Sequence, residues 1–305
     1  MIMIPDRQSS WVDSNNAWQL ILALRGYIRA HRWTYDGVVG SIGLTLDAAK
    51  LPCLSSPEAA LLTVAGDGTW TARTPLSAAA KYLFDLYLPI CLTSANRPLT
   101  IGHLGQSLDG RIATESGASC YVTGPENIVH LHRMRALCDA IVVGAATIRH
   151  DNPQLTTRQV TGNNPVRVVL DSQRRLTADY NVFQDGAATT LVFCDAALAD
   201  RDTLGNAHVI GVPLVKGRLQ LSAVLEQLHA RDLYGVFIEG GGITVSYFLQ
   251  ENLLDQLQIA IAPLLIGSGR PGITLPVIQD LNEGLRPRHR LFTMGNDILF
   301  DCALH

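Results

Sequence analysis

The chain has 305 residues, of which 47% are hydrophobic and 17% are charged, and its formal net charge is −3. A chain of this length and composition can bury a sizeable core, which excludes wholesale disorder. The nearly balanced charge gives no electrostatic reason to expect a nucleic acid or an anionic membrane as partner.

Six cysteines are scattered through the sequence without any CxxC pair: Cys53, Cys91, Cys120, Cys138, Cys194 and Cys302. This spacing argues against a zinc cluster and against a disulfide framework. Residues 1–10 hold no hydrophobic signal-peptide segment, and the early apolar run at 20–24 is too short to cross a bilayer. We therefore expect a soluble, cytoplasmic protein.

Residues 1–98 carry little chemical signal. Apolar residues at helical spacing predict amphipathic helices within 11–31 and 76–88, and Asp13 or Ser14 could cap the first of them. The glycine-containing stretch 37–43 lacks the lysine of a P-loop and is interpreted as a loop. The sequence also lacks a zinc-deaminase motif. With a boundary near Pro98, residues 1–98 are expected to be a small accessory region of unknown function.

From residue 99 onward, strand and helix patterns alternate. Strand patterns fall at 99–105, 140–143, 166–170, 190–193, 208–210, 235–238, 256–262 and within 291–300, and helical patterns fall at 125–138, 145–150, 222–231 and 243–250. This alternation predicts an α/β domain over 99–305, with a mainly parallel sheet flanked by helices. Gly295-Asn296-Asp297 predicts a C-terminal hairpin. In such sheets, ligands bind beyond the carboxyl ends of the strands.

A glycine cluster lies at one of these strand ends. Glu239-Gly240-Gly241-Gly242 follows the strand at 235–238 and precedes the helix at 243–250. Glycines let backbone N–H groups approach a ligand closely, and the first helical turn offers unpaired N–H donors to a phosphate. The same residues could also form a tight turn that binds nothing, so both interpretations stay open at this point.

Further polar residues follow another strand or lie within the helix predicted at 125–138. Ser172, Arg174 and Arg175 suit an added phosphate, such as the 2′-phosphate that separates NADPH from NADH, although a charged exposed turn is an equal alternative. His130 and His132 do not share a helix face, so a metal site is not expected there, and a solvated basic face is the default interpretation.

Seven motifs appear in an order that resembles one family. They are SLDGRIA (107–113), SGASCYVT (116–123), MRALCDAI (134–141), GAATIRHDNPQLTTR (144–158), RVVLDSQRR (167–175), FIEGGG (237–242) and LLDQLQIAIAPLLIGSG (253–269). They resemble the reductase half of the bacterial bifunctional riboflavin-biosynthesis deaminase/reductase over about residues 99–304. The resemblance implies a dihydrofolate-reductase-like fold and a homodimer.

The resemblance also implies a reaction and a set of site residues. The family uses NADPH to reduce the ribosyl group of 5-amino-6-(5-phosphoribosylamino)uracil to ribityl. The implied cofactor contacts are Gly105, Tyr121, Thr147, Asp151, Ser172 and the segment 241–247, with Gly241, Gly242, Ile243 and Thr244 at its start. The implied substrate contacts are Ser119, Arg135, Leu155, Arg158 and Glu239, and the expected catalytic residues are Glu239, His103 and Asp151.

The sequence departs from the family pattern at three points. Residues 1–98 take the place of the deaminase half, Tyr121 replaces a frequent tryptophan, and His103 replaces a frequent lysine. His103 could inherit the charge of that lysine below neutral pH, or it could be a packed core residue. Two other functions stay open: a reductase of a different pterin or pyrimidine, and a non-catalytic NADP-binding protein whose partner surface is residues 1–98.

Overall fold

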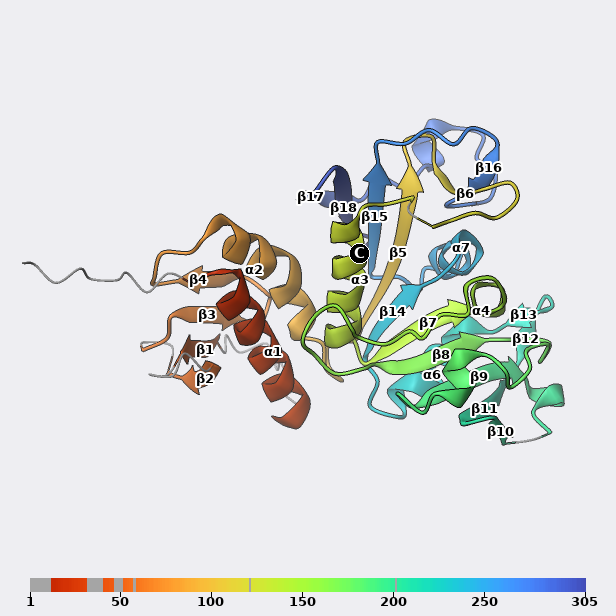
Figure 1. Cartoon of the computed structure of the whole chain (residues 1–305), viewed down its shortest axis with the longest axis horizontal. Helices are drawn as coiled ribbons and strands as arrows, with labels where there is room; N and C mark the ends of the chain where they lie inside the picture. The colour runs from red at the N-terminus through yellow and green to blue at the C-terminus, as the bar shows by residue number, and fades with distance from the viewer. Residues whose placement is uncertain (1–11, 32–40, 47–51, 57–58, 121, 201) are drawn as a thin grey trace, which may run out of the picture. The chain divides into compact units, whose positions relative to one another are not determined.

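The computed structural model describes residues 12–31, 41–46, 52–56, 59–120, 122–200 and 202–305. The chain divides into two compact units, Met1–Pro98 and Leu99–His305. Figure 1 shows the elements of each. Tyr121 and residues 37–40, which carry two of the sequence predictions, lie outside the described residues. In the described part of the chain, no helix combines the length and the apolar character needed to cross a membrane.

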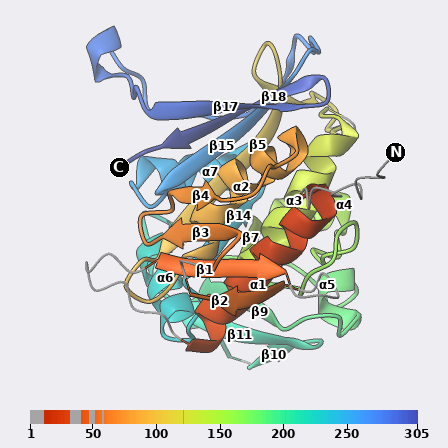
Figure 2. The same ribbon diagram turned by 90° about the vertical axis from the view of Figure 1, so that its left-hand side faces the viewer.

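The first unit is a small antiparallel sheet with both helices on one face (Figure 2). The helices are α1 (Ser14–His31) and α2 (Ala78–Cys91), and the strands are β1 (Ser41–Leu46), β2 (Pro52–Ser55), β3 (Leu62–Ala65) and β4 (Trp70–Ala72) in the order β2-β1-β3-β4. The Asp13 side chain caps α1 by accepting a hydrogen bond from Asn16 N at 2.8 Å, as the sequence predicts. Trp18 of α1 packs edge-to-face on Tyr87 of α2, which joins the two apolar helix faces.

The loop expected at 37–43 is wrong for its last three residues, because Ser41–Leu46 form β1. Gly43 marks a close approach of chains and not a ligand loop. A Cβ at Gly43 would lie 2.5 Å from the carbonyl oxygen of Ser55, its partner across β2. Glycine therefore lets the neighbouring chain segment come close at this position.

The described part of the second unit is built on a ten-stranded sheet in the order β10-β11-β9-β8-β7-β14-β5-β15-β18-β17. The strands are β5 (Leu99–Ser107), β7 (Ala140–Gly144), β8 (Val166–Leu170), β9 (Thr190–Asp195), β10 (Thr203–Leu204), β11 (Ala207–Val212), β14 (Gly235–Glu239), β15 (Gln256–Ala262), β17 (Arg288–Met294) and β18 (Asp297–Ala303). Pairing is parallel from β11 to β15 and antiparallel at β10, β18 and β17. The predicted mainly parallel sheet with a C-terminal hairpin is confirmed.

Helices and two short strand pairs complete this unit. The helices are α3 (Pro125–Leu137), α4 (Ala145–Asp151), α5 (Asn181–Gln184), α6 (Leu221–His229) and α7 (Gly242–Gln250), with 3₁₀ turns at Ala196–Leu198 and Leu281–Glu283. The strand pairs are β12 (Leu214–Val215) with β13 (Arg218–Leu219), and β6 (Arg111–Thr114) with β16 (Gly269–Pro271). The helical patterns read from the sequence are confirmed to within one or two residues at each end.

The two faces of the large sheet are buried by different helices. On one face, Val142, Val168 and Ile238 share a core cluster with residues of α6 and α7, such as Leu228 and Phe248. Side chains of alternate residues point to the other face, where His103 of β5 contacts His130 of α3. Burial on both faces leaves the carboxyl ends of the central strands as the place where polar side chains gather.

Candidate cofactor and substrate site

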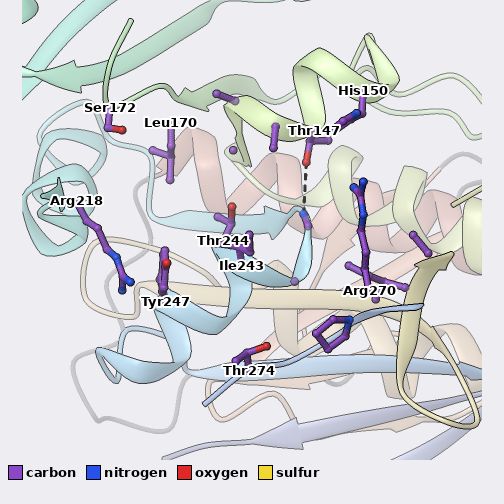
Figure 3. A pocket seen from close by; sticks show the side chains of 18 of the residues that line it. Thr147, His150, Leu170, Ser172, Arg218, Ile243, Thr244, Tyr247, Arg270 and Thr274 are labelled. Atoms are coloured by element: carbon purple, nitrogen blue, oxygen red, sulfur yellow. Dashed lines mark hydrogen bonds between the residues drawn. The ribbon is translucent and has the colours of Figure 1, made fainter. Parts of the chain in front are cut away.

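A cavity of about 670 Å³ lies at the carboxyl ends of β7, β8 and β14 (Figure 3). Its lining includes Gly144 and Leu170 from the ends of β7 and β8, and Gly241 and Gly242 from the start of α7. The loop 117–119 and the segment 270–274 close another side. This volume lies within the range of cofactor and small-molecule sites.

The glycine cluster begins α7 at the wall of this cavity. Gly241 is the N-cap residue, and no side chain caps the helix. Its N–H group lies 3.4 Å from the hydroxyl of Thr147 on α4 (Figure 3). Gly242 is required by sterics, because a Cβ there would collide with the carbonyl oxygen of Gly272. The first turn of α7 therefore presents backbone donors and the positive end of the helix dipole to the cavity.

Most of the sequence-predicted cofactor residues line this cavity. They are Thr147, Asp151, Ser172, Gly241, Gly242, Ile243 and Thr244, and the predicted substrate residue Ser119 lines it as well. Gly105 does not: it lies within β5, where a Cβ would come within 2.7 Å of the Thr123 methyl group. The glycine at 105 thus lets the chain at Thr123 pack against β5.

The two arginines of the 171–175 turn are also absent from the cavity lining. Arg174 takes a left-handed backbone conformation with φ 49°, and its guanidinium donates to Asp200 at 3.0 Å and to the carbonyl of Leu198 at 3.1 Å. Arg175 is exposed, and its backbone N–H donates to Asp171. The Arg174 guanidinium is thus engaged by neighbours of the turn, and the phosphate contact expected for the two arginines from the sequence stays a prediction.

A second group of charged residues lies where β14 ends, next to the glycine cluster. Arg135 of α3 grips Glu239 through two hydrogen bonds, one from Nε at 2.8 Å and one from Nη2. The remaining nitrogen, Nη1, donates to the carbonyl of Thr156 at 3.1 Å. Burial alone would lower the pKa of Arg135, but the charge of Glu239 and its hydrogen bonds raise that pKa above its ordinary value.

Arg158 completes this group and is more accessible than Arg135. Its Nη1 donates to the Thr156 hydroxyl at 2.7 Å, and its backbone N–H lies 3.1 Å from Nδ1 of His132. Partial burial and the neighbouring Arg135 lower the pKa of Arg158, while Glu239 raises it. Two guanidiniums with one carboxylate give these three side chains a net charge of about +1, which favours an anion.

Leu155 occupies a strained position beside this group. It is buried and has a φ of 54°, in the left-handed region that is unfavourable for a leucine. The chain takes this left-handed conformation at 155, and Thr156 next to it accepts hydrogen bonds from Arg135 and Arg158. Leu155 therefore shapes the loop that carries Arg158.

His103 differs from the charged group that the sequence interpretation favoured. It is buried in β5, its Nε2 lies 3.1 Å from Oδ1 of Asn127, and it is not part of the cavity lining. Burial, helped by the nearby His130, lowers the pKa of His103 to about 3. The side chain is therefore neutral at pH 7 and does not supply the positive charge that the family resemblance led us to consider at this position.

The solvated basic face expected on α3 is likewise corrected. His130 and His132 are buried, and burial lowers the pKa of each to about 4. His130 Nε2 lies 2.9 Å from Gln258 of β15, and His132 meets the backbone of Arg158. The interpretation failed because both faces of α3 meet polar partners, which the helical spacing of residues does not show.

Comparison with known proteins assigns the chain to a family. A family described as "RibD C-terminal domain" matches residues 98–299. The chain belongs to this family. It is 33% identical to the 2,5-diamino-6-ribosylamino-4(3H)-pyrimidinone 5′-phosphate reductase of Methanothermobacter thermautotrophicus, over 68% of this chain and 99% of that protein. It is 32% identical to the riboflavin biosynthesis protein RibD of Escherichia coli, over 59% of this chain and 52% of that protein.

A solved structure of Acinetobacter baumannii RibD is 25% identical and superposes with a TM-score of 0.59, covering 76% of this chain and 65% of that one. The chain thus spans about half to two thirds of the RibD proteins it matches. The RibD-type fold and the assignment to the oxidoreductases rest on these matches.

A nicotinamide cofactor is implied for a RibD-type reductase, and the cavity fits one. The uncapped start of α7 offers donors to a diphosphate, and Thr147 and Ser172 add hydroxyls. Two arginines that the sequence analysis did not single out, Arg218 and Arg270, also line the cavity. Neither follows a predicted strand of the main sheet, so strand-end reasoning could not find them.

Proposed function

We propose that this chain is an NADPH-dependent reductase of a phosphoribosylamino-pyrimidine, acting in riboflavin biosynthesis. The observation that carries the proposal is that the charged group around Glu239 lies next in sequence to the glycine cluster that begins α7. Glu239, at the end of β14, is held by Arg135, and two residues later Gly241 begins the helix that faces the cavity. A dinucleotide in the cavity would therefore lie beside an anion-binding group.

In this proposal, different residues hold the cofactor and the substrate. When bound, NADPH would supply a hydride to C1′ of the ring-opened substrate imine, and a proton from solvent would go to the imine nitrogen, which gives a ribityl amine and NADP⁺. Arg158 is proposed to bind the substrate 5′-phosphate. Glu239, fixed by Arg135, is proposed to orient the substrate at the boundary with the cavity. Ser119 and Asp151 line the cavity and are proposed as further contacts.

Two candidate substrates differ in the pyrimidine ring. The leading candidate is 5-amino-6-(5-phosphoribosylamino)uracil, which follows the resemblance to the bifunctional enzyme. The relative from M. thermautotrophicus is named for a 2,5-diamino pyrimidinone, and this chain covers 99% of it. That match favours the 2-amino form as the second candidate.

Steady-state kinetics with both compounds tests the proposal. NADPH oxidation is followed at fixed enzyme concentration with each phosphoribosylamino-pyrimidine, and the ribityl product is identified by mass spectrometry. Turnover of either compound supports the reductase, and the ratio of the two kcat/KM values identifies the ring. Absence of turnover with both compounds, in protein that binds NADPH, would reject the substrate class.

A cytoplasmic homodimer is part of the same proposal. The described cysteines, Cys91, Cys120, Cys138, Cys194 and Cys302, are free thiols, which suits a reducing compartment. β17 is an edge strand of the large sheet, and Leu291 on it is 57% exposed. Leu265, Val277 and Leu281 in the preceding segment are more than 70% exposed. Apolar residues this exposed support a partner surface, and sedimentation of the full chain tests it.

A further inference from the structure

One end of the cavity is formed by residues outside the predicted phosphate turn. Arg218 and Tyr247 lie together at this end, and Leu170 and Ser172 lie across from them (Figure 3). Ser172 comes from the end of β8, whereas Tyr247 lies on α7, more than one helical turn beyond the glycine cluster. The cavity wall here therefore combines a hydroxyl, an aromatic ring and a cation.

The chain fixes the position of Arg218 through a tight hairpin. Lys216 and Gly217 have φ values of 51° and 77°, the left-handed conformation that a two-residue turn of this type requires. The turn pairs Val215 with Arg218, and Gln220 N donates to the carbonyl of Pro213 at 2.9 Å. Arg218 is thus held on a defined strand position and not on a free loop.

The guanidinium of Arg218 is also oriented by its neighbour. Its Cζ lies 3.8 Å from the centroid of the Tyr247 ring, a cation–π contact. Stacking engages the flat face of the guanidinium and leaves its N–H donors at the edge for an anion. Among the described residues, none forms an ion pair with Arg218, in contrast to Arg174, which is bonded to Asp200.

The other cavity arginine occupies a different place. Arg270 lies beside the loop at Gly117, where a Cβ would come within 2.8 Å of its Nη2, and Figure 3 shows Arg270 on the far side of Thr147 from Arg218. The start of α7 lies between the two arginines along the cavity. A dinucleotide whose diphosphate meets that helix start therefore places its two ends near different arginines.

We propose that Arg218, stacked on Tyr247 in the same cavity as Ser172, binds the 2′-phosphate of the cofactor adenosine and sets the preference for NADPH over NADH. This assignment rests on the proposed function, because it takes the cavity as the dinucleotide site. It moves the selective cation from the turn at 174–175 to the β12–β13 hairpin. The charge at that hairpin meets a phosphate that only NADPH carries, so its removal acts on one cofactor and not the other.

Equilibrium binding measures this directly, without any turnover. Titration calorimetry gives Kd values of the full chain for NADPH, NADH, adenosine 2′,5′-bisphosphate and AMP. Arg218→Met should weaken NADPH and the bisphosphate by about tenfold or more and leave NADH and AMP within about twofold. Arg218→Lys should retain part of the preference. Arg231→Met, an exposed arginine that bonds Gln227 on α6, is the matched control and should change nothing.

Substitutions of Tyr247 test the proposal independently. Tyr247→Phe keeps the ring and should keep the NADPH preference, whereas Tyr247→Leu removes the stacking surface and should lower it several-fold. Full preference for NADPH in Arg218→Met would overturn the assignment, as would a loss of preference in Arg174→Met alone. If the parent protein binds neither NADPH nor NADH, the proposed function itself fails, which is a distinguishable result.

Discussion

Arg135 and Glu239 form a two-pronged ion pair between α3 and the end of β14, with the two side chains only 8% and 17% exposed. The pair joins residues 104 positions apart in the sequence. It holds the carboxylate next to the glycine cluster, so that one contact serves both the fold and the proposed substrate site. A bidentate pair of this kind is directional as well as charged.

Removing the acid should cost stability as well as activity. Glu239→Ala leaves the largely buried Arg135 guanidinium without its partner, and we expect a loss of about 3 kcal/mol in the free energy of unfolding. Glu239→Gln keeps an acceptor oxygen and should lose less. Urea unfolding of the full chain measures both, with exposed Glu226→Ala on α6 as the control. Equal, small losses for all three variants would show that the pair contributes little.

Arg158 is expected to act on the substrate phosphate. It is exposed, next to the charge-neutralised Arg135, and so carries the unbalanced positive charge of the group. Arg158→Met should raise KM for a phosphorylated substrate about tenfold or more, through the loss of a charge-assisted bond. The KM of the dephosphorylated analogue should be unchanged by the variant. A parent enzyme that uses both compounds equally well contradicts the phosphate role.

His132 is expected to be a positioning residue for Arg158. Its Nδ1 accepts the backbone N–H of Arg158 at 3.1 Å, which ties the loop to α3. His132→Phe removes the acceptor and should raise KM several-fold while kcat changes less. His132→Asn restores an acceptor of similar reach and should recover most of the loss. If the Phe and Asn variants behave alike, the hydrogen bond does not position Arg158.

The pH dependence of stability follows from the buried histidines. His103, His130 and His132 have pKa values of about 3, 4 and 4, below the ordinary value of 6.5. The unfolded chain takes up these protons near pH 6.5 and the folded chain does not, so the stability is complete above that pH and is lost as pH falls toward 4. Each histidine contributes a slope of about 1.4 kcal/mol per pH unit in that window.

His103→Gln tests this assignment. The Asn127 amide donates to Thr123, so its oxygen faces His103, and glutamine can supply the N–H donor without titrating. The variant should show a shallower fall in melting temperature between pH 6.5 and 5 than the parent. Its kcat/KM profile between pH 6 and 8 should match the parent, because neutral His103 adds no titration there. If the parent loses kcat/KM as pH rises from 6 to 8 and the variant does not, His103 supplies a positive charge to the reaction after all.

The sequence predicted the second unit well because its strands are short apolar runs and its helices have clear ends. The strands at 166–170 and 256–262 match the structure residue for residue. The strand β1 was missed because Ser41-Ile42-Gly43 has the composition of a loop, and its glycine serves packing against Ser55.

The site was predictable where a residue follows a strand directly. Thr147 and Gly241 line the cavity because strand ends place them there. The bonds of Arg174 to Asp200, and of His103 to Asn127, depend on partners 24 or more residues away, which local patterns do not contain. Arg218 was missed for the same reason, since its cavity partner Tyr247 lies on another element.

The most direct test of the proposed reaction is the fate of the transferred hydrogen. The full chain is incubated with 5-amino-6-(5-phosphoribosylamino)uracil, or its 2-amino counterpart, and NADPH deuterated at the transferable position of the nicotinamide. We predict a ribityl product that carries one deuterium at C1′, detected by mass spectrometry and located by NMR. Cofactor oxidation that leaves the sugar unlabelled, or binding of both ligands without any reduced product, would contradict the account.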